Sequence, residues 1–135
     1  MPHKTRSQVE AAICAEMDRQ SVRHAHRNLR YRVRMKSGKV ASYRPAVAVQ
    51  HGPLLFLVEP VLTVARSCAV ERATRFLDQH SPEIVYAVVA PKAVAAKLPP
   101  ESYDEVYGAD DIPKLVRRIK EQDPLGPVRP FAKRR

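Results

Sequence analysis

The sequence has few of the residues that mark secreted, membrane-spanning or fibrous proteins. Its 135 residues include two cysteines, four glycines and no tryptophan. Cys14 and Cys68 form neither a disulfide framework nor a CxxC pair, which favours a reducing compartment, and we expect a cytoplasmic protein. The first residues lack the apolar core of a signal peptide. No apolar run approaches the roughly 18 residues of a membrane span, so we expect no membrane association.

Acidic residues are also scarce in the first half of the chain. Against 14 Asp and Glu stand 24 Lys and Arg, which gives a formal net charge of +10. Residues 1–58 carry 11 basic and 3 acidic side chains, and no acid lies between Asp18 and Glu59. Because unopposed like charges repel each other in a compact protein, this segment indicates a polyanionic partner, and nucleic acid is the first candidate. A merely solubilising surface is the alternative interpretation.

The composition is that of a folded domain with a short tail. Hydrophobic residues make up 44 % of the chain and charged residues 28 %. A chain of this length buries about two-thirds of its unfolded surface, which suffices for one core. We assign residues 1–123 to a single domain, and residues 124–135, which contain three prolines and a basic end, to an extended tail.

Hydrophobic periodicity predicts alternating helices and strands. Helical spacing indicates helices over about 8–23 and 64–79, a short turn at 92–97 and a last helix with Pro113 in its first turn. Ser7 and Glu10 have capping-box spacing, and Asp110 or Asp111 can cap the last helix. Apolar runs predict a central strand over 54–58, a strand over 84–90 and a short edge strand over 105–107. The strand–helix–strand order predicts a mixed sheet and the α/β class.

The clearest pattern is strict alternation over residues 29–35, which places Arg30, Arg32 and Arg34 on one face of a strand. Ser37-Gly38 supplies a tight turn, so we expect residues 40–49 to pair with this strand as an antiparallel hairpin. The arginines lie about 6.8 Å apart, comparable with successive phosphates, and such contacts would position DNA without reading its sequence. Protection of a sheet edge is the alternative. The predicted nucleic-acid-binding residues are Arg27, Arg30, Arg32, Arg34, Lys36, Lys39 and Arg44.

Three short motifs occur in a characteristic order: Glu10 on the first helix, Pro45-Ala46 in the hairpin and Glu59-Pro60-Val61 at the end of the buried strand. This order resembles the PD-(D/E)XK nuclease superfamily, which includes many restriction endonucleases and archaeal Holliday junction resolvases. In that family a helix Glu, an Asp after Pro and a Glu-x-Lys converge on one or two Mg²⁺ ions. The resemblance implies a restriction-endonuclease-like fold, a DNA partner and a homodimer, and the scarcity of aromatic residues favours duplex or branched DNA over single strands.

Two positions depart from the family pattern. Ala46 stands where the metal-binding Asp belongs and cannot bind a metal, and Val61 stands where the Lys belongs and cannot donate a hydrogen bond. We therefore predict a DNA-binding protein with a degenerate, inactive or weak catalytic centre.

Alternatives remain for this function. A Mg²⁺-dependent endonuclease or junction resolvase would use Glu10 and Glu59 as metal ligands and catalytic groups, with substitutes drawn from Arg66, Glu71 or Arg72. An RNA-binding module is a further alternative, since charge alone does not separate the two polymers.

Several of these residues also have simpler interpretations. Glu10 can merely close the capping box with Ser7, and Glu59 can pair with an arginine. His24, His26 and His51 lack a recognised metal-site spacing and lie among arginines, so we expect them to contact phosphates rather than a metal. Cys14 is expected to fill the core.

Overall fold

The computed structural model describes residues 5–62, 67–80 and 83–121, with the side chains of 67–69 excepted. Arg66 and the predicted tail over 124–135 lie outside the described residues. Within the described ranges, no helix combines the length and hydropathy that crossing a membrane requires. The main elements are α1 (Gln8–Arg19), β1 (Ala25–His26), β2 (Tyr31–Arg34), β3 (Val40–Tyr43), β4 (Val47–His51), β5 (Leu54–Pro60), α2 (Ser67–Gln79), β6 (Ile84–Ala90), α3 (Lys92–Ala95), β7 (Glu105–Gly108) and α4 (Ile112–Lys120).

The main sheet is mixed, as the sequence predicts. Its strand order is β1-β4-β5-β6-β7. The β1–β4 and β4–β5 pairs are antiparallel, whereas β5–β6 and β6–β7 are parallel. The continuous apolar run of β5 therefore lies at the centre of the sheet, and β7 is an edge strand.

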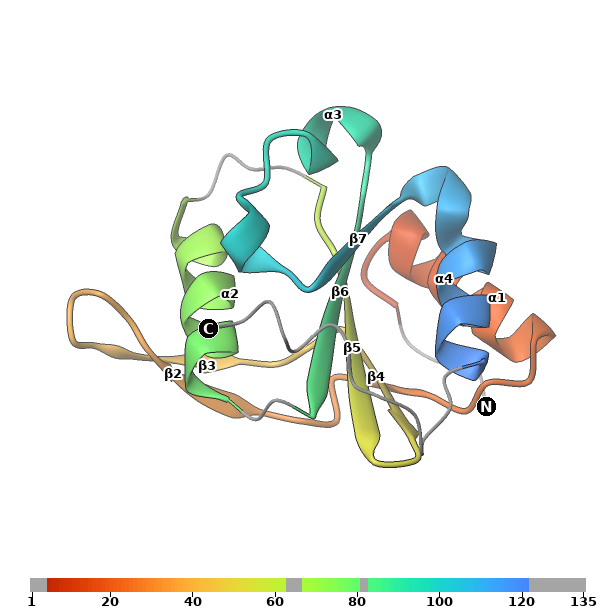
Figure 1. Ribbon diagram of the computed structural model, residues 1–135, viewed down its shortest axis with the longest axis horizontal. Helices are drawn as coiled ribbons and strands as arrows, with labels where there is room; N and C mark the ends of the chain where they lie inside the picture. Colours follow the sequence, from red (N-terminus) through yellow and green to blue (C-terminus); the bar gives the residue numbers. More distant parts are fainter. Residues whose placement is uncertain (1–4, 63–66, 81–82, 122–135) are drawn as a thin grey trace.

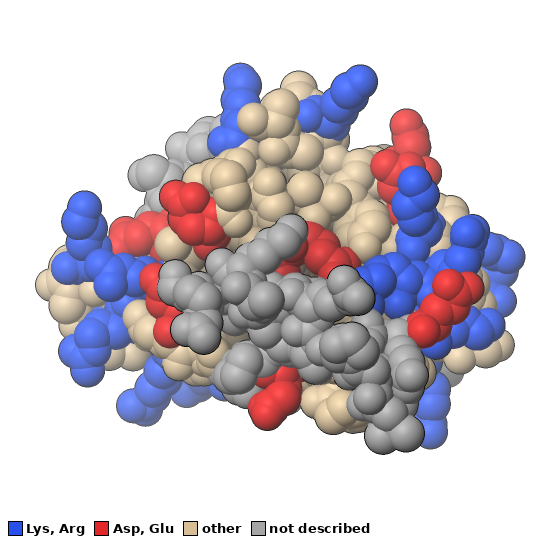
Figure 2. Space-filling model, in the orientation of Figure 1, with Lys and Arg blue, Asp and Glu red and all other residues tan. Residues whose placement is uncertain are grey.

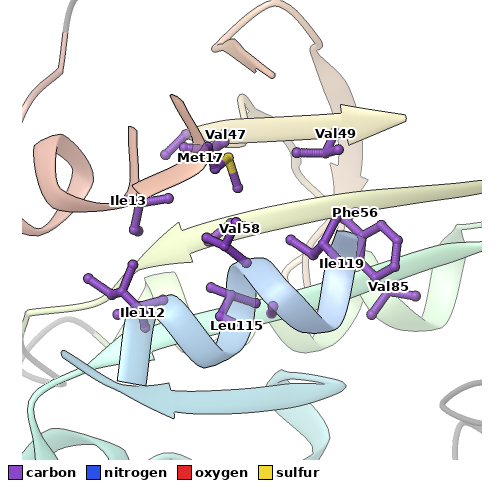
Figure 3. Close-up of a cluster of buried hydrophobic side chains, with 14 of the residues drawn as sticks. Ile13, Met17, Val47, Val49, Phe56, Val58, Val85, Ile112, Leu115 and Ile119 are labelled. Atoms are coloured by element: carbon purple, nitrogen blue, oxygen red, sulfur yellow. The ribbon is translucent and has the colours of Figure 1, made fainter. Parts of the chain in front are cut away.

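Two apolar cores lie on the two faces of this sheet. Helices α1 and α4 cover one face, while α2 and the hairpin β2–β3 lie on the other (Figure 1). In the first core, Ile13 and Met17 of α1 meet Leu115 of α4 and Val58 of β5 (Figure 3). The second core surrounds Phe76 of α2. The predicted class, α/β with a mixed sheet flanked by helices, is confirmed.

The predicted hairpin is correct only over its first half. Tyr31 pairs with Tyr43 and Arg34 with Val40, but the chain then leaves the hairpin, and β4 pairs with β5 instead. Pro45, which separates β3 from β4, has no N–H to donate to a strand ladder. The expectation that residues 40–49 form one strand is therefore wrong, because the proline divides that segment between two sheets.

Helix ends follow local capping chemistry. Ser7 accepts a hydrogen bond from the Glu10 amide at 3.1 Å, as the capping box predicts. Helix α1 ends before residue 23 because Ser21 adopts a left-handed φ of 61° and the Val22 amide returns to the Met17 carbonyl at 2.7 Å. Asp111 occupies the N-cap position of α4, but its side chain makes no capping hydrogen bond, contrary to expectation.

Candidate functional site

The outward face of the hairpin β2–β3 is basic. Along β2, Val33 is buried while Arg32 and Arg34 are exposed, and these arginines lie opposite Ser42 and Val40 of β3. Figure 2 shows Lys and Arg side chains gathered over the projecting hairpin, at the left of the view. The exposed basic residues here are Arg30, Arg32, Arg34, Lys36, Lys39 and Arg44. We call this surface the basic hairpin face.

Side chains of α2 bind backbone groups of the hairpin and, among the described residues, leave the arginine side chains of the hairpin unbound to the helix. The Arg34 amide donates to Gln79 Oε1 at 2.9 Å, and Gln79 Nε2 donates to the Arg34 carbonyl at 2.8 Å. The Lys36 amide donates to Glu71 Oε2 at 2.6 Å. Within the described ranges, no ion pair involves an arginine of the basic hairpin face. These guanidinium groups therefore face solvent on a fixed strand.

Arg27 differs from the other predicted nucleic-acid-binding residues because it points inward. Its backbone adopts a left-handed φ of 51°, and its amide donates to the Ala46 carbonyl at 3.2 Å. Its guanidinium donates to both carboxylate oxygens of Glu10, at 2.6 and 2.8 Å. The Arg27 side chain is only 17 % exposed. Its charge is thus largely taken up within the protein.

Glu10 is an ionised carboxylate buried between α1 and β1. It is 1 % exposed and accepts hydrogen bonds from Arg27, from the Arg6 amide at 3.1 Å and from His26 Nδ1 at 2.7 Å. Burial alone would raise the pKa of Glu10, but the bonds from Arg27, Arg6 and His26 together hold it below its usual value. Its contacts exceed those of a capping box, because it also ties α1 to the chain around β1.

Glu59 lies at the end of β5 with two neutral partners. Its Oε1 accepts hydrogen bonds from the Tyr43 hydroxyl at 2.7 Å and from the Ala46 amide at 3.2 Å, and the hydroxyls of Tyr43 and Tyr86 lie 3.1 Å apart. Burial raises the pKa of Glu59, although these bonds and the nearby charges of Arg72 and Arg27 oppose the shift. The direct partners of Glu59 are thus a phenol and an amide rather than an arginine.

A cavity of about 200 Å³ opens beside Glu59 and is also lined by Val61, Arg72 and Tyr86. Arg72 lies over the Tyr43 ring, 4.9 Å from its centroid. Among the residues considered as catalytic substitutes, Arg72 therefore reaches the cavity. Glu71 instead binds the Lys36 amide.

The histidines divide between two places. His26 pairs with Val47 at the start of β4, whereas His51 lies at the other end of that strand. His24 and His26 instead lie beside Cys14, and the candidate ligand atoms of these three residues are within 4.8 Å of one another. Sequence alone does not indicate this grouping, because the helical position of Cys14 predicts only a buried core residue.

We expect the parent to lose stability as the pH rises through the pKa of Glu59, and we expect Glu59→Gln to lose less. Folding raises the pKa of Glu59. The stability that protonated Glu59 contributes is therefore fully present below its pKa in the unfolded chain, about 4.3, and is lost as the pH rises through its pKa in the folded protein. Glu10, with its lowered pKa, has the opposite dependence. Urea midpoints from about pH 4 to pH 7 should therefore fall less in Glu59→Gln than in the parent. Glu101→Gln, at an exposed glutamate, is the control, and identical profiles for the parent and Glu59→Gln would contradict the assignment.

Comparison with known proteins supports this architecture. No protein-family model matches the chain, and no curated protein matches it. A solved restriction endonuclease, PspGI in complex with its substrate DNA, is similar in structure, with a TM-score of 0.50 and 15 % sequence identity. The similarity covers 93 % of this chain and 54 % of the endonuclease, so the chain spans about half of that protein's length. The chain therefore has a restriction-endonuclease-like fold.

Proposed function

We propose that this protein binds DNA through the basic hairpin face and has lost the metal-dependent cleavage of nucleases with this fold. The observation that carries the proposal is the row of exposed arginines on a strand whose backbone is fixed by α2. Alternate residues of a strand lie about 6.8 Å apart on one face, so Arg32 and Arg34 are spaced to follow a phosphate backbone. Arg30 and Arg44 extend this charge beyond the paired residues.

The aromatic residues of the hairpin favour duplex or branched DNA over single strands. Tyr31 and Tyr43 turn toward α2, and each ring contacts Phe76 edge to face, at centroid distances of 5.0 and 5.2 Å. Rings packed in this way do not offer the stacking surface that single-strand binders use. The outward face is therefore suited to backbone contacts, which carry affinity without sequence readout.

The centre around Ala46 supports binding without cleavage. Magnesium prefers several oxygen ligands, but Ala46 offers a buried methyl group, and both oxygens of Glu10 already accept hydrogen bonds from Arg27. Val61 cannot orient an attacking water. The residues present do not fit the magnesium site that the family resemblance implies, because an internal guanidinium already supplies the positive charge to Glu10.

Salt-dependent DNA binding tests the role of the basic hairpin face. The parent is compared with the triple variant Arg30→Ala, Arg32→Ala, Arg34→Ala on one duplex over a range of salt concentrations. If each arginine neutralises one phosphate, the slope of log affinity against log salt should decrease in magnitude by about 3. The matched control removes the same charge from exposed positions of α4: Lys114, Arg117 and Lys120 to alanine. An equal decrease in the control would overturn the assignment to the hairpin.

A cleavage assay on the parent and on Glu59→Ala tests whether the protein has lost metal-dependent DNA cleavage. We expect intact DNA on denaturing gels in both Mg²⁺ and EDTA. Cleavage that requires Mg²⁺ and disappears in Glu59→Ala would instead make the protein a nuclease with substituted catalytic groups. If the protein binds RNA more tightly than DNA at the same salt concentration, its partner is RNA rather than DNA.

A further inference from the structure

A cysteine and two histidines meet between α1 and β1, apart from the basic hairpin face. Cys14 is buried on α1, and His24 and His26 are partly buried on the segment that enters and forms β1. The His24 and His26 rings meet edge to face at 5.0 Å. Each residue can direct one ligand atom into a space where all three atoms lie within 4.8 Å.

Hydrogen bonds on the outer side of both rings orient this cluster. His26 Nδ1 lies 2.7 Å from Glu10 Oε2, and His24 Nδ1 lies 3.1 Å from the Val22 carbonyl. A neutral imidazole that donates from Nδ1 carries its lone pair on Nε2. Metal-binding histidines usually donate their second ring N–H to a carboxylate or a carbonyl in this way. In each histidine, Nε2 is therefore the ring atom that would bind a metal.

We propose that Cys14, His24 and His26 bind a zinc-class divalent cation through the thiolate and the two Nε2 atoms. His24 Nε2 lies 3.3 Å from Cys14 Sγ. Typical zinc bonds of about 2.3 Å to sulfur and 2.0 Å to nitrogen place tetrahedral ligands roughly 3.5 Å apart, close to this separation. A thiolate with two imidazoles suits zinc rather than magnesium. Three protein ligands leave the fourth position to water, and an open depression that adjoins the cluster at His24 is also lined by Asp18, Ser21 and Arg23.

The charges around the cluster are compatible with a cation. Two arginines lie near the cluster: the charge of Arg27 is balanced by Glu10, and Arg23 lines the neighbouring depression together with Asp18. Burial and the carboxylates of Asp18 and Glu10 raise the pKa of the Cys14 thiol. The same carboxylates make the surroundings more negative, which favours a bound cation over the bare thiolate. This site is independent of DNA binding and would link α1 to the segment that carries Arg27.

Cobalt titration of the full, untagged, reduced chain tests the site. Co²⁺ alone is expected to bind with one equivalent per chain, with an absorption band from thiolate-to-cobalt charge transfer, and Zn²⁺ should displace it. Cys14→Ser should abolish the band, and His24→Gln should weaken binding at least about tenfold. The control variants Cys68→Ser and His51→Gln should retain both, because they alter the same residue types elsewhere.

Circular dichroism of each variant confirms that the comparison is made on folded protein. A second measurement does not need the variants: Zn²⁺ should raise the melting temperature of the parent through preferential binding to the native state. Absence of both the thiolate band and the melting shift in the parent would overturn the proposal. A band that survives Cys14→Ser and disappears in Cys68→Ser would overturn it as well.

Discussion

Arg27→Ala is expected to lower the free energy of unfolding by about 3–5 kcal/mol, the cost of leaving a buried charge without its partner. Glu10 is 1 % exposed, and two of its hydrogen bonds come from the Arg27 guanidinium. Without that guanidinium, the carboxylate must either stay charged in a buried site or take up a proton. Urea unfolding at neutral pH, read as a change of midpoint at constant slope, measures the loss.

Arg30→Ala is the matched control, since it removes the same residue type from an exposed position three residues away. Its effect on stability should stay within about 0.5 kcal/mol. The double variant Glu10→Leu, Arg27→Met should be less destabilised than the sum of its single variants, because the two groups interact directly. If Arg27→Ala loses as little unfolding free energy as Arg30→Ala, the ion pair between Arg27 and Glu10 does not stabilise the fold.

Phe76→Ala is expected to cost about 3–5 kcal/mol and to loosen the hairpin selectively. Phe76 is fully buried and contacts Tyr31 and Tyr43 of the hairpin as well as Tyr86 of β6. An isolated two-stranded hairpin is only marginally stable in water, so the order of β2–β3 depends on this packing. The substitution removes no charge from the basic hairpin face.

Amide hydrogen exchange separates the local effect from the global one. In Phe76→Ala, protection should fall further at Val33 and Ala41 of the hairpin than at Val58 of the central strand. Phe76→Leu, which retains most of the apolar volume, should recover most of the stability. A uniform loss of protection across both sheets would contradict a selective role in holding the hairpin.

The regular parts of this fold were predictable from local patterns. The apolar runs of β5 and β6 are buried because both faces of a central strand are covered by helices, and continuous apolar sequence is the sign of that position. The alternation around Arg32 and Arg34 likewise predicted which side chains face solvent. Periodicity failed at Pro45, where apolar residues continue on both sides of a change of sheet, and it placed the end of α1 too late.

The candidate sites were less predictable because they depend on contacts distant in sequence. Nothing in a basic run distinguishes Arg27 from Arg30, yet the left-handed backbone at Arg27 turns its side chain toward Glu10, 17 residues earlier. Cys14 meets His24 only because α1 ends at Arg19 and the chain reverses at Ser21. Neither reversal has a glycine to announce it in the sequence.

The hairpin is a detour from the main sheet. His26 of β1 lies opposite Val47 of β4, so the chain leaves the sheet after one strand and returns as that strand's neighbour. Residues 27–46 connect these two strands and form the hairpin. At its tip, Gly38 has a φ of 92° and open space where a side chain would lie. We therefore expect changes in length or charge at this tip to leave the strand order and register of the main sheet intact, because the base of the hairpin is held separately by the packing of Tyr31 and Tyr43 on Phe76.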